Sequence, residues 1–172
     1  NDENVHLLQG RNRAITEPIL SNESIPPFDN TAVDGYAVKA IDTKGATQET
    51  PISLTVLETI AAGKPPTFAI QSGECSKIMT GASIPDGADA VVMVERTEQQ
   101  ENGSVVAIEE EVSKGQHIRR SGEDLEPGDL VIPQGTILNA AHLGLLASLG
   151  IYQITTVRIP TVGVFSTGDE LI

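Results

Sequence analysis

Short stretches of apolar and β-branched residues, each ended by a turn, dominate the middle of the chain. Residues 52–57 alternate in part between apolar and polar side chains, residues 88–94 are nearly all apolar, and residues 104–108 form another such stretch. Stretches of this length and composition are typical of β-strands. The 16 glycines and 10 prolines of the 172 residues supply turn signals between them. The pattern predicts a mostly β fold.

One segment near the C-terminal end has a helical pattern instead. Leu143, Leu146 and Leu149 recur at a spacing that places them on one face of a helix. Asn139 can cap the start of this helix, and Gly150 stands where a left-handed residue commonly ends one. With this helix added, the expected fold class is α+β with β predominant.

Two further local patterns predict a hairpin and an N-terminal helix. The dipeptide Asn102-Gly103 supplies the positive φ angles of a tight hairpin turn. We therefore expect residues 90–100 and 105–111 to form its two arms. In residues 5–15, apolar side chains recur at a spacing that fits one helix face, with an interruption at Gly10. A short helix is expected there.

The last fourteen residues have the pattern of a different fold. Residues 161–165 are almost wholly apolar, which is typical of a strand buried in a parallel sheet. Residues 166–170 then turn toward what would be a helix. Because a parallel strand needs a crossover and a partner strand, we expect residues 159–172 to begin an α/β domain that continues beyond this sequence.

Charge and composition exclude several classes of partner. Eleven basic and 24 acidic residues give a net charge of −13, the wrong sign for a protein that binds nucleic acid or an anionic membrane. An anionic ligand would therefore need a local patch of positive charge on a surface that is otherwise negative. Cys75 is the only cysteine, so no internal disulfide can form, and we expect it to be buried in a strand. With no secretory signal pattern and no apolar run long enough to span a bilayer, we predict a cytoplasmic protein.

The first candidate for chemistry is the polar loop at residues 26–37, PPFDNTAVDGYA. It holds two carboxylates, an amide and a hydroxyl between two prolines and an Asp-Gly turn. One interpretation is a structural turn between extended segments. The other is a rigid loop that presents Asp34 to a cation or to phosphate-bound magnesium, since Mg²⁺ needs only one or two carboxylates when substrate phosphates supply the rest.

The second candidate is the basic stretch at residues 114–124, KGQHIRRSGED. It can be an exposed strand edge with compensating charges. Alternatively, Arg119 or Arg120 holds an oxyanion while Glu123 or Asp124 handles a metal or a proton. A weaker third candidate is residues 79–85, whose hydroxyls and glycine would suit an anion.

Five motifs in fixed order resemble those of one family. They are FDNTAVDGYA at 28–37, IMTGA at 78–82, the segment 81–92 with its P-x-G-A, IRRSGED at 118–124, and STGDEL at 166–171. In this order they are similar to the MoeA and gephyrin E-domain family, the molybdopterin molybdenumtransferases. The resemblance covers most of the chain, although residues 1–27 match only loosely.

The resemblance implies a function and a set of site residues. Family members insert molybdenum from molybdate into adenylylated molybdopterin, release AMP, depend on Mg²⁺ and form homodimers. By motif, the catalytic positions are Asp34, Thr80, Asp124 and Glu170, with Asp34 and Asp124 also the metal ligands. The positions for binding the pterin or oxyanion are Arg119, Arg120, Ser166 and Thr167.

The resemblance also implies a domain plan. Residues 1–28 and 118–158 would form one discontinuous dimerisation domain, residues 29–117 an inserted β-rich domain, and residues 159–172 the start of a pterin-binding α/β domain. Without the rest of that domain, the 172 residues alone are expected to be inactive. Two alternatives remain open: a gephyrin-like scaffold without catalysis, and a paralogue that uses tungstate.

Overall fold

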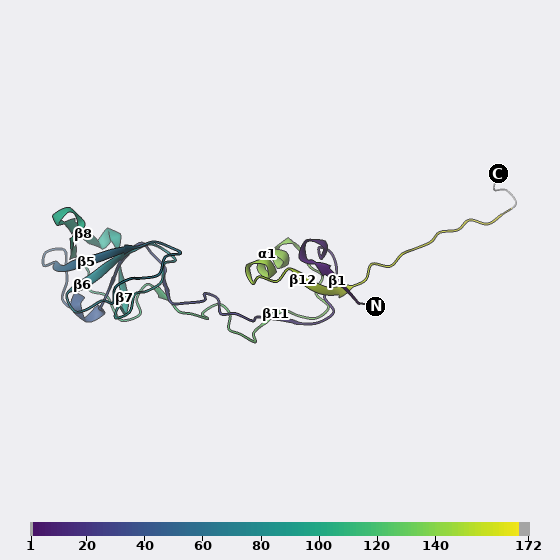
Figure 1. Ribbon diagram of the computed structural model, residues 1–172, viewed down its shortest axis with the longest axis horizontal. Coiled ribbons are helices and arrows are strands. Elements are labelled where there is room, and N and C mark those ends of the chain that lie inside the picture. Colours follow the sequence, from purple (N-terminus) through teal and green to yellow (C-terminus); the bar gives the residue numbers. More distant parts are fainter. Residues whose placement is uncertain (1, 169–172) are drawn as a thin grey trace. The chain divides into compact units, whose positions relative to one another are not determined.

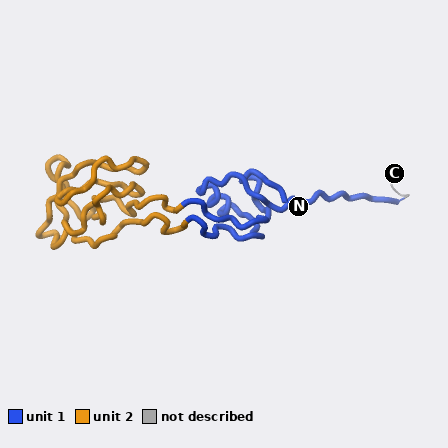
Figure 2. Tube along the Cα trace, turned by 60° about the horizontal axis from the view of Figure 1, so that its bottom comes forward, with its two compact units in different colours: residues 1–23, 127–172 blue, residues 24–126 orange. Residues whose placement is uncertain are grey.

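The computed structural model describes residues 2–168 and divides them between two compact units. Unit 1 combines residues 1–23 with residues 127–172, and unit 2 comprises residues 24–126, as the two colours in Figure 2 show. The chain therefore leaves unit 1, builds unit 2 and returns. The fold is mostly β with one α-helix, as the sequence predicts.

Unit 2 is built on a six-stranded sheet with strand order β7-β4-β6-β5-β9-β8. The strands are β4 (Gly35–Val38), β5 (Ile52–Ile60), β6 (Glu74–Ile78), β7 (Ala90–Met93), β8 (Thr97–Gln100) and β9 (Val105–Ile108), several of them labelled in Figure 1. Neighbours are antiparallel except β5 and β6, which run parallel. A separate, shorter pair is formed by β3 (Asn30–Thr31) and β10 (Ile118–Arg119), which run antiparallel. Three 3₁₀ turns complete the unit: η2 (Ala40–Thr43), η3 (Val94–Arg96) and η4 (Glu101–Gly103).

The predicted hairpin is confirmed only near its tip, because residues 90–93 of the expected first arm form β7 and pair with β4 instead. Strands β8 and β9 pair antiparallel, with Gln100 opposite Val105. The connection is longer than a two-residue turn because η4 lies inside it. Glu101, Asn102 and Gly103 all have positive φ.

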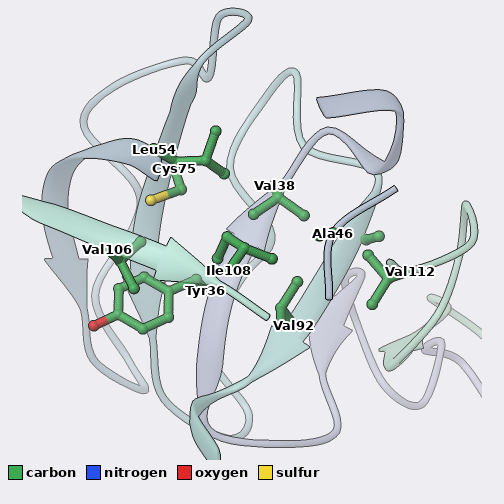
Figure 3. Packing of buried hydrophobic residues seen from close by; sticks show 10 residues of the cluster. Tyr36, Val38, Ala46, Leu54, Cys75, Val92, Val106, Ile108 and Val112 are labelled. Carbon is green, nitrogen blue, oxygen red and sulfur yellow. The ribbon is translucent and has the colours of Figure 1, made fainter. Parts of the chain in front are cut away.

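The sheet of unit 2 has apolar clusters on both faces. The larger cluster is drawn in Figure 3 and is built around Tyr36, Val38, Leu54, Cys75, Val92, Val106 and Ile108. A second cluster contains Ala37, Ile60, Ile78, Ala82 and Val91. Because side chains alternate along β4, Tyr36 and Val38 belong to the first cluster and Ala37 to the second. All four residues of β4 are buried, so the start of this strand is fixed in position.

In unit 1, short strands from the first 20 residues pair with strands from residues 130–157. Strand β1 (Asp2–His6) pairs antiparallel with β12 (Gln153–Val157), and β2 (Ile19–Leu20) pairs with β11 (Leu130–Ile132). The α-helix α1 (Ala140–Ser148) and the 3₁₀ turn η1 (Leu7–Gln9) complete it. Asn139 accepts a hydrogen bond from the backbone N–H of His142, and Gly150 follows the helix at φ 69°. Its predicted cap and end are therefore confirmed.

Three sequence predictions differ from the structure. Residues 5–15 do not form the expected helix: only Leu7–Gln9 make a 3₁₀ turn, and Val5 belongs to β1, where pairing with β12 satisfies the backbone and buries its side chain. Residues 158–168 carry no helix or strand, and Val164 and Phe165 are each 90% exposed. Residues 118–126 belong to unit 2, since β10 pairs with β3 and Leu125 pairs with Ile25. Among residues 2–168, no helix is long and apolar enough to cross a membrane.

Candidate functional site

Asp34 and Thr80 meet at neighbouring strand ends in unit 2. Asp34 directly precedes β4 and Thr80 follows β6, and these strands are antiparallel with Gly35 opposite Ile78. The end of one strand therefore lies beside the start of the other. Oδ1 of Asp34 accepts two hydrogen bonds from Thr80, one from the backbone N–H and one from the hydroxyl, each at 2.7 Å.

The backbone around this pair is held closely. A Cβ added to Gly35 would lie 2.0 Å from the carbonyl oxygen of Val92 on β7, so only glycine allows the two strands to approach in this way. The Asp34 carbonyl accepts a hydrogen bond from Val94 at 3.0 Å, and Met79 N–H donates to Ile60 at 3.0 Å. The side chain of Asp34 is thus exposed on a rigid support.

Hydrogen bonding determines the acidity of Asp34. The Thr80 N–H and then the Thr80 hydroxyl stabilise the carboxylate, and together they outweigh the opposing effect of burial. The pKa of Asp34 is therefore below its ordinary value. The group is a carboxylate at neutral pH. Among the described residues, both of its hydrogen bonds end on Oδ1, and Oδ2 accepts none.

The two arginines of the basic stretch are paired with carboxylates. Arg119 Nη2 lies 2.6 Å from Asp124 Oδ2, and Arg120 Nη1 lies 2.5 Å from Asp29 Oδ2. The side chains of both pairs are between 39% and 55% exposed. Neither guanidinium is a free anion receptor in this structure. An incoming anion would have to displace a carboxylate.

Asp29 is the residue that sequence reasoning did not single out. Its Oδ1 accepts the Ser121 N–H at 2.8 Å while Oδ2 holds Arg120. The Ser121 N–H lowers the pKa of Asp29, burial opposes this, and Arg120 lowers it further. The sequence signal was present, because Asp29 is the second carboxylate of the polar loop. The sequence could not show that its partners would be Arg120 and Ser121, which lie 91 and 92 residues further along the chain.

Strand β3 connects the two groups of site residues. Thr31 exchanges backbone hydrogen bonds with the segment after Thr80, donating to Ala82 at 3.1 Å and accepting from Gly81 at 2.9 Å. On its other side Thr31 lies opposite Ile118 of β10. The polar loop, the IMTGA motif and the basic stretch are therefore neighbours in one unit, although the sequence separates them widely.

The remaining predicted residues do not belong to unit 2. Ser166 and Thr167 belong to unit 1, where they are exposed and carry no helix or strand. Glu170 lies outside the described residues. Within residues 2–168, no group of three or more His, Cys, Asp or Glu side chains is arranged to hold a metal ion.

Comparison with known proteins identifies the family. The family described as "MoeA N-terminal region (domain I and II)" matches residues 1–150. The chain belongs to the MoeA family. A molybdopterin molybdenumtransferase 2 of Mycobacterium tuberculosis is 43% identical over 169 residues, which cover 97% of this chain and 41% of that protein. The molybdopterin molybdenumtransferase of Haemophilus influenzae is 42% identical over 170 residues, covering 99% and 41%.

Solved structures agree with the MoeA fold. The crystal structure of a molybdopterin biosynthesis MoeA protein from Pyrococcus horikoshii OT3 matches with a TM-score of 0.86 and 38% identity, covering 91% of this chain and 41% of that one. The chain thus spans about two-fifths of the length of these relatives. Its described residues correspond to a MoeA N-terminal region.

Proposed function

We propose that this chain is the N-terminal part of a molybdopterin molybdenumtransferase, which inserts molybdenum from molybdate into adenylylated molybdopterin and releases AMP. The relatives' names support the activity. The observation that carries the proposal for this chain is the contact between Asp34 and Thr80. It joins two of the motifs and leaves one carboxylate oxygen of the exposed Asp34 side chain without a hydrogen bond among the described residues.

Asp34 is the proposed ligand of the Mg²⁺ ion that would also bind the reacting phosphates. Magnesium keeps several waters and takes one or two carboxylates plus substrate phosphates, so a single exposed Oδ2 fits it. When bound, the ion offsets charge on the phosphate groups during cleavage of the phosphoanhydride. The depressed pKa of Asp34 keeps its carboxylate charged for this role. Thr80 holds the carboxylate in place, and its hydroxyl oxygen can accept a hydrogen bond from substrate or water.

Asp124 is the second proposed metal ligand and acid–base group. Its ion pair with Arg119 would have to open before it could take either role. In the structure Asp124 is paired with Arg119. Ion pairs this exposed are worth only about 0–1 kcal/mol, so a dianion such as molybdate can take Arg119 and release Asp124. Arg120 offers the same exchange with Asp29. Glu170, Ser166 and Thr167 are proposed from the family motif alone, as further cleft residues.

The proposal extends to the assembly and the location of the protein. A homodimer in the cytoplasm is expected from the family resemblance. The 172 residues alone are expected not to release AMP, because they span only about two-fifths of the length of the molybdopterin molybdenumtransferases that they match. Measurable AMP release by this chain alone would contradict that expectation.

The test is AMP release by the longer protein that contains this region. Adenylylated molybdopterin is supplied with Mg²⁺ and with molybdate or tungstate in parallel. We expect release to require Mg²⁺ and an oxyanion, and the preferred oxyanion identifies the metal. A folded protein that releases no AMP under any of these conditions would instead favour the gephyrin-like scaffold.

A further inference from the structure

Asp29 ties together segments of unit 2 that carry the proposed site residues. Its backbone carbonyl accepts the N–H of Ile84 at 3.1 Å, which attaches it to the segment that follows Thr80. Its side-chain Oδ1 accepts the N–H of Ser121 at 2.8 Å, and its Oδ2 lies 2.5 Å from Nη1 of Arg120 in the basic stretch. The proposed function uses this carboxylate only as the present partner of Arg120.

The strand pair beside these contacts is too short to fix its own register firmly. β3 and β10 contribute two residues each, with Thr31 opposite Ile118, and the bond from Ala32 N–H to the His117 carbonyl at 2.9 Å adds one more contact. Left-handed residues stand on either side of β10, with φ 60° at His117 and 76° at Gly122. Because a slip of one residue turns every side chain of a strand to the opposite face, side-chain contacts have to hold a pair this short.

The two arginines of this segment point in different directions. Arg119 turns forward along the chain to Asp124, whose Oδ2 lies 2.6 Å from its Nη2. Arg120 turns back to Asp29, and its Nη2 would lie 3.7 Å from a Cβ added to Gly115 near the start of the basic stretch. The two arginine side chains are 41% and 55% exposed, so burial enforces neither direction.

We propose that Asp29 is a positioning residue that holds Arg120 away from Asp124, so that Arg119 alone pairs with Asp124. The carboxylate of Asp29 occupies the guanidinium of Arg120 and also fixes the next backbone N–H, so both contacts act at the same point of the chain. Without that carboxylate, Arg120 would lose its partner while Asp124 lies only four residues further along the same turn. Arg120 would then compete with Arg119 for Asp124.

The chemical consequence rests on the proposed function, in which Asp124 leaves Arg119 to become a ligand of Mg²⁺. With Arg119 as its partner, one weak and exposed ion pair has to open before Asp124 can bind the ion. A second guanidinium would add competition for the same carboxylate. Asp29 therefore lowers the Mg²⁺ concentration that the site requires, without itself contacting the ion.

Arginine side-chain NMR tests the pairing on the 172-residue chain itself. The Nε–Hε signals of Arg119 and Arg120 are assigned with single Arg→Lys variants and recorded at low ionic strength, where exposed ion pairs are least screened. In the unaltered chain, Asp124→Asn should shift the Arg119 signal and leave the Arg120 signal in place. In the Asp29→Asn background, Asp124→Asn should shift the Arg120 signal as well. The matched control background is Asp42→Asn, an acceptor elsewhere in unit 2, which should behave like the unaltered chain.

AMP release by the longer protein tests the consequence through its dependence on Mg²⁺. At saturating molybdate, Asp29→Asn should raise the Mg²⁺ concentration for half-maximal release by about tenfold, the lower end of the cost of altering a group that orients a metal ligand. The double variant Asp29→Asn/Arg120→Gln should have the same Mg²⁺ requirement as Arg120→Gln alone, because the competing guanidinium is gone. A purely structural loss would not be restored by removing Arg120.

The inference is overturned if the Arg120 signal ignores Asp124→Asn in the Asp29→Asn background. It is also overturned if Arg120 responds to Glu123→Gln instead, since Glu123 already accepts the Arg120 N–H at 3.0 Å. A raised Mg²⁺ requirement that persists in the double variant would reject it as well.

These outcomes are distinct from failure of the proposed function. If the unaltered longer protein releases no AMP, the transferase is rejected and the NMR signals still decide the role of Asp29. If release depends on Mg²⁺ but Asp29→Asn leaves both the arginine pairing and the Mg²⁺ requirement unchanged, the transferase is retained and the positioning role is rejected.

Discussion

Asp34 and Thr80 are 46 residues apart in the sequence, yet Thr80 donates both its backbone N–H and its hydroxyl to the same oxygen of Asp34, each at 2.7 Å. This arrangement fixes the direction of the second oxygen and keeps the carboxylate charged. It arises because β4 and β6 pair antiparallel with Gly35 opposite Ile78.

Removing the Thr80 hydroxyl should raise the pKa of Asp34. In Thr80→Val the backbone N–H remains, so the pKa should rise only part of the way to its ordinary value. A depressed carboxyl pKa contributes stability above the unfolded-state pKa that is lost as the pH falls through the folded-state value. The variant should therefore lose less stability on acidification. Carboxyl carbon NMR titration measures the pKa directly, with Thr80→Ser as the matched control. A shift of equal size in Thr80→Ser would refute this explanation.

Asp29 should stabilise unit 2 by joining the polar loop to Arg120 and Ser121 of the basic stretch. Asp29→Asn keeps an acceptor for the Ser121 N–H but loses the ion pair, so we expect a loss of about 1 kcal/mol or less. Asp29→Ala also removes the acceptor and should cost more. Urea unfolding of the two variants checks the order. Equal losses would mean that the Ser121 hydrogen bond contributes nothing.

Leu146 should be the main packing residue of α1. It is 0% exposed in the cluster of unit 1, so Leu146→Ala should lower the free energy of unfolding by about 2–5 kcal/mol. The neighbouring residue Leu145 is 37% exposed, so Leu145→Ala should lower the free energy of unfolding by about 1 kcal/mol or less. Amide exchange in β1 and β12 reports the effect within unit 1. Similar protection factors in both variants would contradict the assigned helix face.

Cys75 should be unreactive in the folded protein. It is fully buried on β6, and burial raises the pKa of its thiol to about 12. Because the thiolate is the reactive form, a disulfide reagent such as DTNB should label it at pH 8 only when unit 2 unfolds. Labelling rates with and without urea measure this. Fast labelling of the native chain would show that β6 opens readily.

Local sequence signals predicted the elements that local interactions stabilise. The helix over Ala140–Ser148 has its cap at Asn139 and its end at Gly150, and all of these signals lie within a dozen residues. The hairpin of β8 and β9 is likewise a local structure. The burial of Cys75 followed from its place in a predicted strand and from the preference of free cysteine for buried positions.

Contacts between distant residues decided the features that sequence patterns did not reveal. Residues 2–6 form a strand because their partners are residues 153–157, and nothing in the local spacing of Val5 records this. The pairing of Arg120 with Asp29 spans 91 residues. The apolar residues 161–165 have a strand pattern, but a strand also needs neighbouring strands to pair with, and local spacing cannot supply them.

The central claim is that Asp34 would hold the Mg²⁺ ion that binds the substrate phosphates, and AMP release by Asp34→Asn in the longer protein tests it most directly. The matched control is Asp42→Asn, because Asp42 also accepts one hydroxyl, from Ser72, and one backbone N–H, from Gly73. With adenylylated molybdopterin, Mg²⁺ and molybdate, we predict that Asp34→Asn lowers the rate by about 100-fold or more. Asp42→Asn should keep nearly the full rate. A near-normal rate in a folded Asp34→Asn protein would contradict the account.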